Sequence, residues 1–253
     1  MVARVLEWGL VSQGDYFLID GDATFVEHAA LWLAEWSRAR GSGCVHGDGG
    51  VRITGCGTDL RVHMKCARAE VLEPGTVGSP ADLLVCNSLL DLVDVPTLLP
   101  RLLRLVKPGG LCWLTTNFDG ETIFEPGHPH DRILMDVYHR SMDERRRDGE
   151  PAGDSRSGRH LFGHLRAVQA EIIAAGSSDW VVFGSDGSYP GDEAYFVEYI
   201  LHTIELELDG RDVFTPGQVG GWLADRRGQL ARGELVYVAH QLDILARRGP
   251  VGT

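Results

Sequence analysis

The chain has 253 residues, of which 43% are hydrophobic and 24% charged, and its net charge is −12 at pH 7. This length suits one sizeable domain, and the acidic balance excludes the wide basic face that nucleic-acid binding needs. We expect no membrane span, because no run of about 18 apolar residues occurs, and no signal peptide, because the N-terminus lacks an apolar segment. The five cysteines form no Cys-x-x-Cys pair, which disfavours a disulfide framework or a zinc ribbon and favours a cytoplasmic protein.

Helix and strand patterns alternate at the start of the chain. Val2–Leu10 has the spacing of a short amphipathic helix, Tyr16–Ile19 is apolar like a strand, and Phe25–Trp36 has strong helical periodicity. Asp20 follows the strand at its carboxyl end, and Asp22 or Thr24 suits the N-cap of the helix. Without further context Asp20 is a turn residue.

Residues 41–60 form a glycine-rich insertion. Its segment Gly55-Cys56-Gly57-Thr58 has the composition of a phosphate-binding loop, but such a loop follows a buried strand and opens a helix. Leu60–Cys66 instead alternates like a strand. The glycines are therefore predicted to make the turns of an inserted hairpin.

The stretch Ala81–Pro126 contains two apolar runs, Asp82–Cys86 and Leu111–Thr116, separated by an amphipathic helix. Lys107-Pro108-Gly109-Gly110 ends that helix, since proline cannot continue it and glycine can take a left-handed cap. Two parallel strands with a right-handed helical crossover are predicted. Ligands bind outside the carboxyl ends of such strands, so a site is expected near the polar residues there: Asn87, Ser88, Asn117 and Asp119.

The rest of the chain is predicted to continue with a polar loop, helices and strands. The loop spans residues 117–130. The helices are Ile133–Arg145, Leu161–Ala175, Glu193–Leu208 and Gln218–Arg232, and the strands are Ser177–Phe183 and Leu235–Ala239.

Asn87 after a strand, the leucine-rich helix, and Lys107–Gly110 before an apolar strand together resemble the later half of a class I S-adenosylmethionine-dependent methyltransferase. The resemblance implies a Rossmann-like, doubly wound, mostly parallel α/β sheet with an antiparallel late strand. It implies a single domain over residues 1–253, with 117–160 as a substrate-side loop and helix. It further implies S-adenosyl-L-methionine as cofactor and a small molecule as substrate.

The same resemblance implies cofactor contacts for Asp20, Gly21, Ala69, Glu70, Asn87 and Ser88. Asp20 matches the acid that accepts hydrogen bonds from the ribose hydroxyls, a task that suits an acceptor-only carboxylate. Glu70 matches the acid that contacts the adenine amino group, although it is longer than the usual Asp and a solvent-facing Glu70 is equally open.

The family's first strand and glycine-rich turn, which wraps the methionine part of the cofactor, have no counterpart before Val2–Leu10. We therefore expect an N-terminally truncated version of the fold that binds S-adenosylmethionine weakly or not at all. Met1 is then an internal methionine of a longer parent, or the chain is a remnant. The alternative is a rearranged sheet in which the strand ending at Asp20 pairs directly with Asp82–Cys86.

No catalytic residue is assigned by the sequence, and the candidates are Asp119, Tyr138, His139 and Asp179. Adjacent helical residues point about 100 degrees apart, so at most one of Tyr138 and His139 faces a pocket. Tyr138 lies on the apolar face, which makes His139 a surface histidine. His128 and His130 lack a third ligand, so no metal site is predicted.

Three functional classes remain open. They are a small-molecule methyltransferase impaired by loss of the glycine-rich loop, a non-catalytic methyltransferase-like binding or partner protein, and a nicotinamide-dependent oxidoreductase. The last is the weakest, because it requires Gly-x-Gly-x-x-Gly after the first strand and none occurs. No nucleic-acid or membrane partner is expected, and the sequence does not indicate an oligomeric state.

Overall fold

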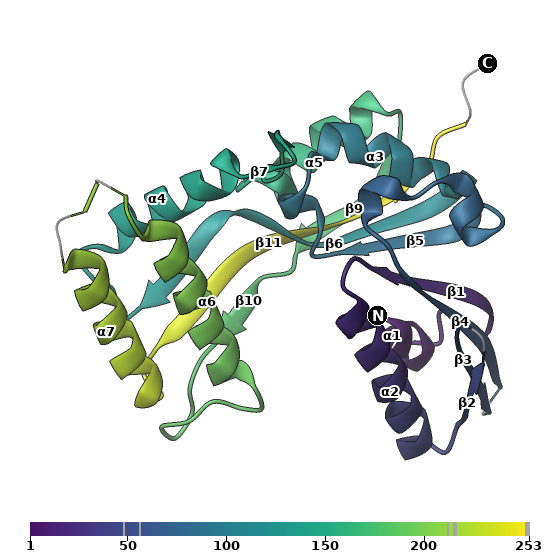
Figure 1. Ribbon diagram of the computed structural model, residues 1–253, viewed down its shortest axis with the longest axis horizontal. Coiled ribbons are helices and arrows are strands. Elements are labelled where there is room, and N and C mark those ends of the chain that lie inside the picture. The colour runs from purple at the N-terminus through teal and green to yellow at the C-terminus, as the bar shows by residue number, and fades with distance from the viewer. Residues whose placement is uncertain (48, 56, 212, 215–216, 251–253) are drawn as a thin grey trace. The chain divides into compact units, whose positions relative to one another are not determined.

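The computed structural model describes residues 1–47, 49–55, 57–211, 213–214 and 217–250 (Figure 1). Cys56, at the centre of the glycine loop considered above, lies outside the described residues. The chain folds as two compact units, Met1–Pro80 and Ala81–Thr253, each with its own sheet. The single domain expected over residues 1–253 stays a prediction.

The first unit packs two helices against a four-stranded sheet (Figure 1). Its strand order is β1-β4-β3-β2, with β1 parallel to β4 and the other neighbours antiparallel. The β2–β3 hairpin lies where the glycine-rich segment predicts one. The elements are α1 (Val2–Glu7), β1 (Gln13–Asp20), α2 (Ala23–Ala39), β2 (Gly43–Gly47), β3 (Gly50–Gly55), β4 (Thr58–Cys66) and the 3-10 turns η1 (Ala69–Val71) and η2 (Pro74–Val77).

The second unit is built on a five-stranded sheet of order β10-β11-β6-β5, with β9 also paired to β11. β5 and β6 are parallel, and β11 is antiparallel to β6, which confirms a mixed α/β class with an antiparallel late strand. Its elements are β5 (Ala81–Asn87), η3 (Leu90–Leu92), α3 (Val95–Arg104), β6 (Val106–Glu125), α4 (Asp131–Glu144), β7 (Arg146–Arg147), β8 (Glu150–Pro151), α5 (Ser157–Ala167), β9 (Glu171–Ser177), β10 (Trp180–Val182), α6 (Glu193–Leu208), α7 (Gln218–Ala231) and β11 (Val236–Arg247).

The tetrapeptide after α3 makes the turn that its composition predicts. In the β5–β6 ladder, Val106 pairs with Ala81 and Leu111 pairs with Leu83. The tetrapeptide Lys107–Gly110 loops out between these two pairs. Gly109 takes a φ of +77°, and a Cβ on Gly110 would lie 2.6 Å from the Val106 side chain. Both positions therefore require glycine.

Two predicted elements are wrong. The polar loop expected from Asn117 is instead the second half of β6, a 20-residue strand that continues because β11 supplies its hydrogen-bonding partner. The helix expected over Leu161–Ala175 ends at Ala167, and Glu171–Ser177 forms β9. Gln169 takes a φ of +56°, which no helix accommodates, and the β-branched Ile172 and Ile173 favour the strand that pairs with β11.

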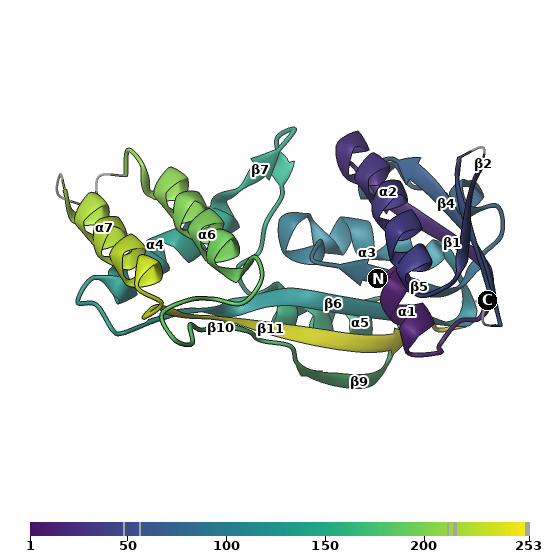
Figure 2. The ribbon, with the colours of Figure 1, turned by 90° about the horizontal axis from the view of Figure 1, so that it is seen from below.

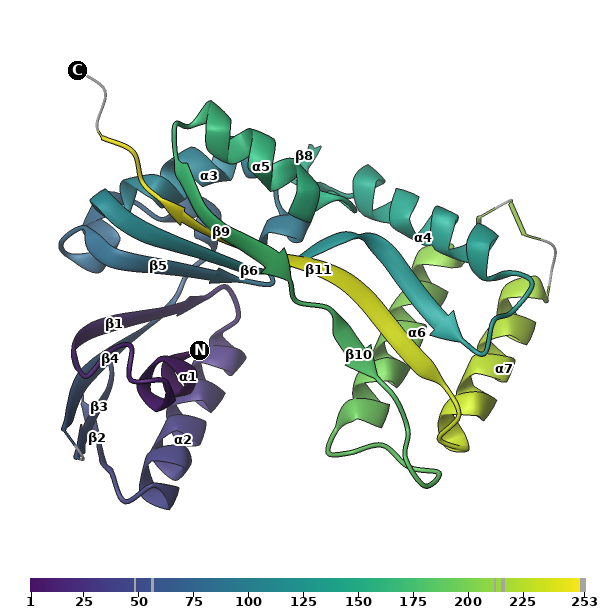
Figure 3. The ribbon, with the colours of Figure 1, turned by 180° about the vertical axis from the view of Figure 1, so that it is seen from behind.

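One end of the second unit carries a hydrophobic cluster. Figures 2 and 3 show α4, α6 and α7 grouped beside the ends of β6, β10 and β11. Phe124, Trp222 and Tyr237 meet there at ring distances of 5.4 Å, and Leu134, Leu201 and Ile204 are fully buried. This cluster anchors the long arm of the sheet that carries the polar residues described next.

Candidate functional site

In the first unit, Asp20 ends β1 beside the end of its parallel neighbour β4. The backbone oxygen of Asp20 accepts a hydrogen bond from Ala67 N at 2.8 Å. The carboxylate is exposed, and its Oδ1 accepts one hydrogen bond, from Asp22 N at 2.9 Å. Asp22 itself caps α2 by accepting from Thr24 N at 2.8 Å, as predicted for the N-cap. Asp20 thus presents its carboxylate at the carboxyl end of β1, where the backbone N–H of Asp22 in the following loop holds it in place.

The other predicted cofactor residues of this unit surround Asp20. Gly21 is exposed and open, with Arg68 Cγ the nearest atom to an added Cβ at 3.6 Å. Ala69 and Glu70 begin η1, directly after β4, and Glu70 pairs with Arg68 at 3.2 Å. Because β1 and β4 are parallel, their carboxyl ends lie side by side. The four predicted cofactor residues that follow them therefore lie at the same end of the sheet: Asp20, Gly21, Ala69 and Glu70.

In the second unit, a β-bulge gathers polar groups where β5 ends. Between the pairs Leu114–Ile244 and Asn117–Leu242, two residues of β6 lie opposite the single residue Asp243. These two residues are Thr115 and Thr116. Asp243 Oδ1 accepts from Thr116 N at 2.8 Å and from Ser178 Oγ at 2.6 Å.

Asn87, the last residue of β5, joins this group. Its Oδ1 accepts from Thr115 Oγ1 at 2.8 Å, and its Nδ2 donates to Ser88 Oγ at 3.3 Å. Ser88 and Thr116 have φ values of +51° and +60°. A β-branched residue rarely adopts that conformation, and backbone strain of this kind gathers at functional sites.

Relief of that strain is a testable expectation. Thr116→Gly should raise the free energy of unfolding by about 1 kcal/mol, because glycine adopts the left-handed region without the Cβ penalty. Thr115→Gly is the matched control and should destabilise, since Thr115 is 3% exposed and loses its hydrogen bond to Asn87. Urea unfolding of both variants measures the difference, and equal destabilisation would contradict the assignment of strain.

A second bulge lies farther along the same strands. Three residues of β6, Asp119–Glu121, lie opposite His240, between the pairs Phe118–Gln241 and Thr122–Ala239. Asp119 is 4% exposed, and its Oδ1 accepts from both Arg159 N and Arg159 Nε at 2.8 Å. The carboxylate thereby satisfies a free N–H in the first turn of α5 and binds the Arg159 guanidinium.

His240 connects the second bulge to the segment after β9. Its Nδ1 lies 2.8 Å from Asp179 Oδ1, and its Nε2 lies 3.5 Å from Asp119 Oδ2. Burial raises the pKa of Asp179, but hydrogen bonds from Ser177 Oγ, Gln241 N and His240 outweigh it, so the pKa lies below its ordinary value. Asp179 is thus held as a carboxylate beside the imidazole.

The two bulges gather two groups of interacting polar residues, which the neighbouring residues Ser178 and Asp179 join along the chain. We call them together the polar belt: Asn87, Ser88, Thr115, Thr116, Asp119, Arg159, Ser178, Asp179, His240 and Asp243. Bulges commonly re-aim side chains beside active sites. The belt offers carboxylate, imidazole and hydroxyl groups that can orient a polar small molecule and accept a proton from it.

Some of the predicted site residues of the second unit lie together on the polar belt, whereas another is buried. Asn87, Ser88, Asp119 and Asp179 lie on the polar belt. Asn117 is fully buried, and its Nδ2 donates to the oxygens of Leu114 and Leu242, which makes it a structural support of the first bulge.

The two adjacent candidates on α4 face the protein interior. Tyr138 is 6% exposed, and burial raises its pKa to about 12, so it is a packing residue. His139 is half-buried, with its Nε2 3.0 Å from Thr122 Oγ1, rather than the surface histidine expected. Burial lowers its pKa, despite nearby acidic residues.

The histidine pair His128 and His130 is a loop feature. His128 Nδ1 accepts from His130 N at 3.1 Å, and its Nε2 lies 3.4 Å from Asp225. Across the described ranges, no three His, Cys, Asp or Glu side chains are arranged to hold a metal ion. No helix in the described part of the chain is long and apolar enough to cross a membrane.

Sequence reasoning missed Thr116, Arg159, Ser178 and Asp243. Nothing in their local sequence marks them, since Thr116 and Asp243 are 127 positions apart and meet only through strand pairing. His240 follows the predicted strand Leu235–Ala239, where the sequence predicts a structural histidine that hydrogen-bonds nearby backbone, whereas its partners are the carboxylates of Asp179 and Asp119.

Comparisons with known proteins gave no matching family model and no matching curated protein. Among the solved structures similar to the chain are several methyltransferases. One is a putative methyltransferase from Bacillus halodurans C-125, with 9% identity, 94% of this chain and 84% of that chain covered, and a TM-score of 0.49. Another is geranyl diphosphate C-methyltransferase from Streptomyces coelicolor A3(2), with 12% identity, 98% and 68% covered, and a TM-score of 0.42.

The [4+2]-cyclase SpnF is also similar, with 17% identity, 99% of this chain and 71% of that chain covered, and a TM-score of 0.43. The geranyl diphosphate enzyme is described in complex with S-adenosyl-L-homocysteine. The predicted resemblance to methyltransferases is thus found again among solved structures. Chemistry must be argued from the residues of this chain.

Proposed function

We propose that this chain is an S-adenosylmethionine-dependent methyltransferase that acts on a small molecule. The observation that carries the proposal is Asp20, an exposed carboxylate at the carboxyl end of a parallel strand and directly before a capped helix. Within the described part of the chain, the carboxylate accepts one hydrogen bond, from Asp22 N. Its remaining acceptor capacity suits the two hydroxyls of a ribose.

The cofactor residues are proposed as the sequence predicts them. Asp20 holds the ribose, Gly21 allows close approach of the backbone, and Ala69 with Glu70 borders the adenine. For Asn87 and Ser88, at the end of β5, a cofactor contact is proposed on the sequence resemblance alone. When bound, the cofactor supplies an electrophilic methyl group on a sulfonium.

The polar belt is proposed to serve the acceptor molecule. A small hydroxyl or amine acceptor must be oriented and must lose a proton, and positioned carboxylates and imidazoles perform both tasks. Asp119 and Asp179 flank His240, so this part of the belt is the proposed catalytic centre. Tyr138 and His139 are not proposed for catalysis, because both face the packed core.

Cofactor affinity is expected to be weak. In the described residues, no glycine-rich turn joins a buried strand to a helix, and such turns present backbone N–H groups to a charged ligand. This observation also favours the second candidate function, a non-catalytic methyltransferase-like protein that uses the fold to bind a partner. The two candidates differ in whether S-adenosylmethionine binds at all.

A binding titration with two matched variants tests the proposal. S-adenosylmethionine and S-adenosylhomocysteine should bind the parent chain more weakly than micromolar, and Asp20→Asn should weaken binding by about tenfold, because charge-assisted hydrogen bonds are lost. Asp22→Asn is the control, since asparagine also caps helices and the same charge is removed. Ligand-observed NMR suits weak binding.

The outcomes separate the two candidates. Binding that Asp20→Asn weakens and Asp22→Asn leaves unchanged supports the methyltransferase. Absence of any binding by the parent chain supports the non-catalytic protein. Binding that both variants leave unchanged overturns the ribose role of Asp20.

A further inference from the structure

Next to His240, the sheet face that carries the proposed catalytic centre becomes apolar. Residues paired directly across strands share a face of the sheet, and successive residues of one strand alternate between its faces. His240 and Val238 lie on one face of β11, since Ala239 between them is 2% exposed and faces the other way. Val238 pairs with Ile123 of β6 on one side and with Val181 of β10 on the other. These three side chains form a row across three strands beside His240.

The helices at this end of the unit cover the opposite face of the same strands. Phe124, Tyr237 and Val182 each follow or precede a member of the row by one position, and all three are buried in the cluster that includes residues of α4, α6 and α7. Figure 2 shows these three helices gathered on one face of the strands. The row faces the other way, since Ile123 is 44% exposed and Val181 54%. Its apolar atoms are therefore accessible to a ligand.

Two more apolar side chains extend the row. Val236 lies two positions before Val238 in β11, and Phe183 directly follows β10, two positions after Val181. We call the five residues the apolar patch: Ile123, Val181, Phe183, Val236 and Val238. Because strands lie about 4.8 Å apart and rise about 3.4 Å per residue, the patch covers about 10 Å by 7 Å. These dimensions suit one ring with a short chain attached.

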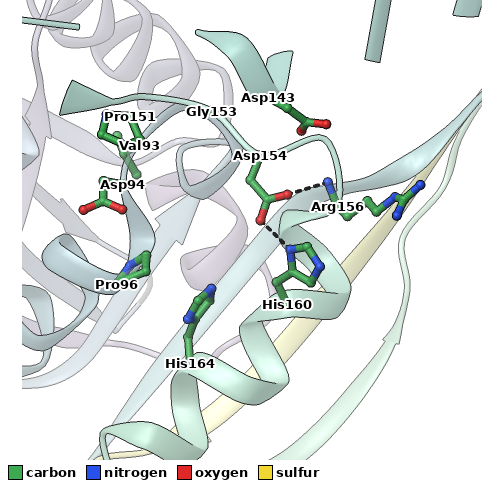
Figure 4. Close-up of a pocket in the computed structure, with 10 residues that line it drawn as sticks. All are labelled: Val93, Asp94, Pro96, Asp143, Pro151, Gly153, Asp154, Arg156, His160 and His164. Atoms are coloured by element: carbon green, nitrogen blue, oxygen red, sulfur yellow. Dashed lines mark hydrogen bonds and ion pairs between the residues drawn. The ribbon is translucent and has the colours of Figure 1, made fainter. Parts of the chain in front are cut away.

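Two arginines border the catalytic centre on the side away from the apolar patch. Gly120 belongs to the second bulge, and an added Cβ there would lie 3.3 Å from Arg156 Cγ and 3.7 Å from Arg159 Nη2. Arg156 also lines the pocket drawn in Figure 4, but its guanidinium points away from the histidines of that pocket. A molecule held at His240 thus has charged side chains on one side and the apolar patch on the other. Its apolar part therefore extends over the patch.

The catalytic centre is accessible to the polar head of such a molecule. The side chains of His240 and Asp179 are 32% and 34% exposed, whereas that of Asp119 is 6% exposed. The imidazole is thus supported by two carboxylates and still open to solvent on the face that continues into the apolar patch. A hydroxyl group at this position can form a hydrogen bond with the ring.

We propose that the acceptor is a hydroxyl compound with an apolar body, of the size of an alkylphenol, and that this body binds the apolar patch. The assignment rests on the proposed function, because it names the kind of molecule that the catalytic centre takes. The hydroxyl lies at His240 and the body crosses Val238. A second copy of the chain is the weaker occupant, since a stable interface needs about 20–30 residues from each partner and the patch is far smaller.

A series of phenols tests the apolar patch without any cofactor. Phenol, 4-ethylphenol and 4-butylphenol are titrated into the full chain at pH 7, and backbone amide NMR shifts are followed. Affinity should rise about twofold for each CH₂ group, because an open surface removes roughly half of the apolar area that full burial removes. 4-Butylphenol should thus bind about tenfold more tightly than phenol and shift the amides of Ile123, Val181 and Val238. Equal affinity across the series overturns the proposal.

A double variant and a matched control locate the gain. Ile123→Thr combined with Val181→Thr keeps β-branched residues that favour strands but makes the patch polar. The affinity ratio of 4-butylphenol to phenol should then fall from about tenfold to about threefold. Ile173→Thr is the control, because Ile173 is 40% exposed in β9, outside the patch, and it should leave the ratio unchanged. A ratio that the double variant leaves unchanged, or that the control lowers equally, contradicts the role of the patch.

His240→Gln tests the position of the hydroxyl. All three phenols should bind about fivefold more weakly, because the hydrogen bond between the hydroxyl and the ring is lost. The ratio between 4-butylphenol and phenol should stay the same, since the patch is intact. Unchanged affinity for all three phenols overturns the position of the hydroxyl at His240.

The two proposals fail separately. If the phenols bind as expected and S-adenosylmethionine does not bind, the apolar patch stands as a binding surface and the methyltransferase falls. If the cofactor binds through Asp20 and the phenol affinities are equal, the methyltransferase stands and its acceptor is not an alkylphenol-like molecule on this patch.

Discussion

Replacement of Arg226 by Met should lower the free energy of unfolding by about 2–3 kcal/mol, because it removes the charge-assisted hydrogen bonds of a buried guanidinium to the partly exposed Asp131. Arg226 is fully buried, and its Nη2 lies 2.5 and 2.6 Å from the two carboxylate oxygens of Asp131. Its Nη1 donates to Pro126 O at 2.6 Å, and Trp222 Nε1 also donates to Asp131 at 2.7 Å. The pair thus joins α7 to the start of α4 beside the hydrophobic cluster that contains Phe124, Trp222 and Tyr237.

Urea unfolding measures this loss, with Arg232→Met as the control. Arg232 pairs with Glu234 on the surface, where ion pairs contribute little, so its replacement should change stability only slightly. A double variant, Arg226→Met with Asp131→Leu, should recover much of the loss, since well-packed apolar residues often replace a buried pair without penalty. Equal effects of Arg226→Met and Arg232→Met would contradict the prediction.

The same pair predicts a pH dependence. Burial raises the pKa of Asp131, but hydrogen bonds from Arg226, Trp222 and His128 N outweigh it, so the folded-state pKa lies below the ordinary value. The ion pair therefore contributes its full share to the free energy of unfolding above the unfolded-state Asp131 pKa of about 3.9. That contribution disappears as the pH falls through the lower pKa of Asp131 in the folded state. The stability difference between the parent chain and Arg226→Met should shrink in that acidic range.

Gly233→Ala should lower the free energy of unfolding by about 2–5 kcal/mol. Gly233 ends α7 with a φ of +69°, and an added Cβ would lie 2.4 Å from the backbone carbon of Gly187. Alanine incurs both the left-handed backbone penalty and a backbone overlap that no side-chain rotation relieves. The overlap would force the turn at Gly187 away from the end of α7.

Gly210→Ala isolates the first of these two costs. Gly210 has a φ of +70° and no atom within 4 Å of an added Cβ, so only the backbone penalty of about 1–2 kcal/mol applies. Urea or thermal unfolding of both variants gives the comparison. A loss in Gly233→Ala no larger than in Gly210→Ala would show that the Gly187 turn moves freely.

Local sequence patterns predicted much of the first unit. Asp22 caps α2 where its composition indicates, and the glycines of residues 41–60 turn a hairpin. In the second unit, the amphipathic α3 and the Lys107–Gly110 turn also follow from local chemistry, because helix faces and left-handed turns depend on residues a few positions apart.

Prediction failed where long-range pairing overrides local preference. Asn117 and Gly120 are turn-forming residues, yet they lie within β6, because β11 pairs with this segment and the bulges absorb the extra residues. Ile172 lies within the predicted helix Leu161–Ala175, yet it pairs with Ala246 in the sheet. Neither partner is visible from the local sequence.

The sequence by itself determined most of the helices and strands, the carboxylate at Asp20 and the polar ends of the strands, since each depends on neighbours along the chain. Only the tertiary structure decided which polar residues act together. The antiparallel pairing of β11 with β6 brings Asp243 to Thr116 and His240 to Asp119. Helix α5 adds Arg159 to the second of these groups. These contacts depend on strand register, which is set by packing across the whole sheet.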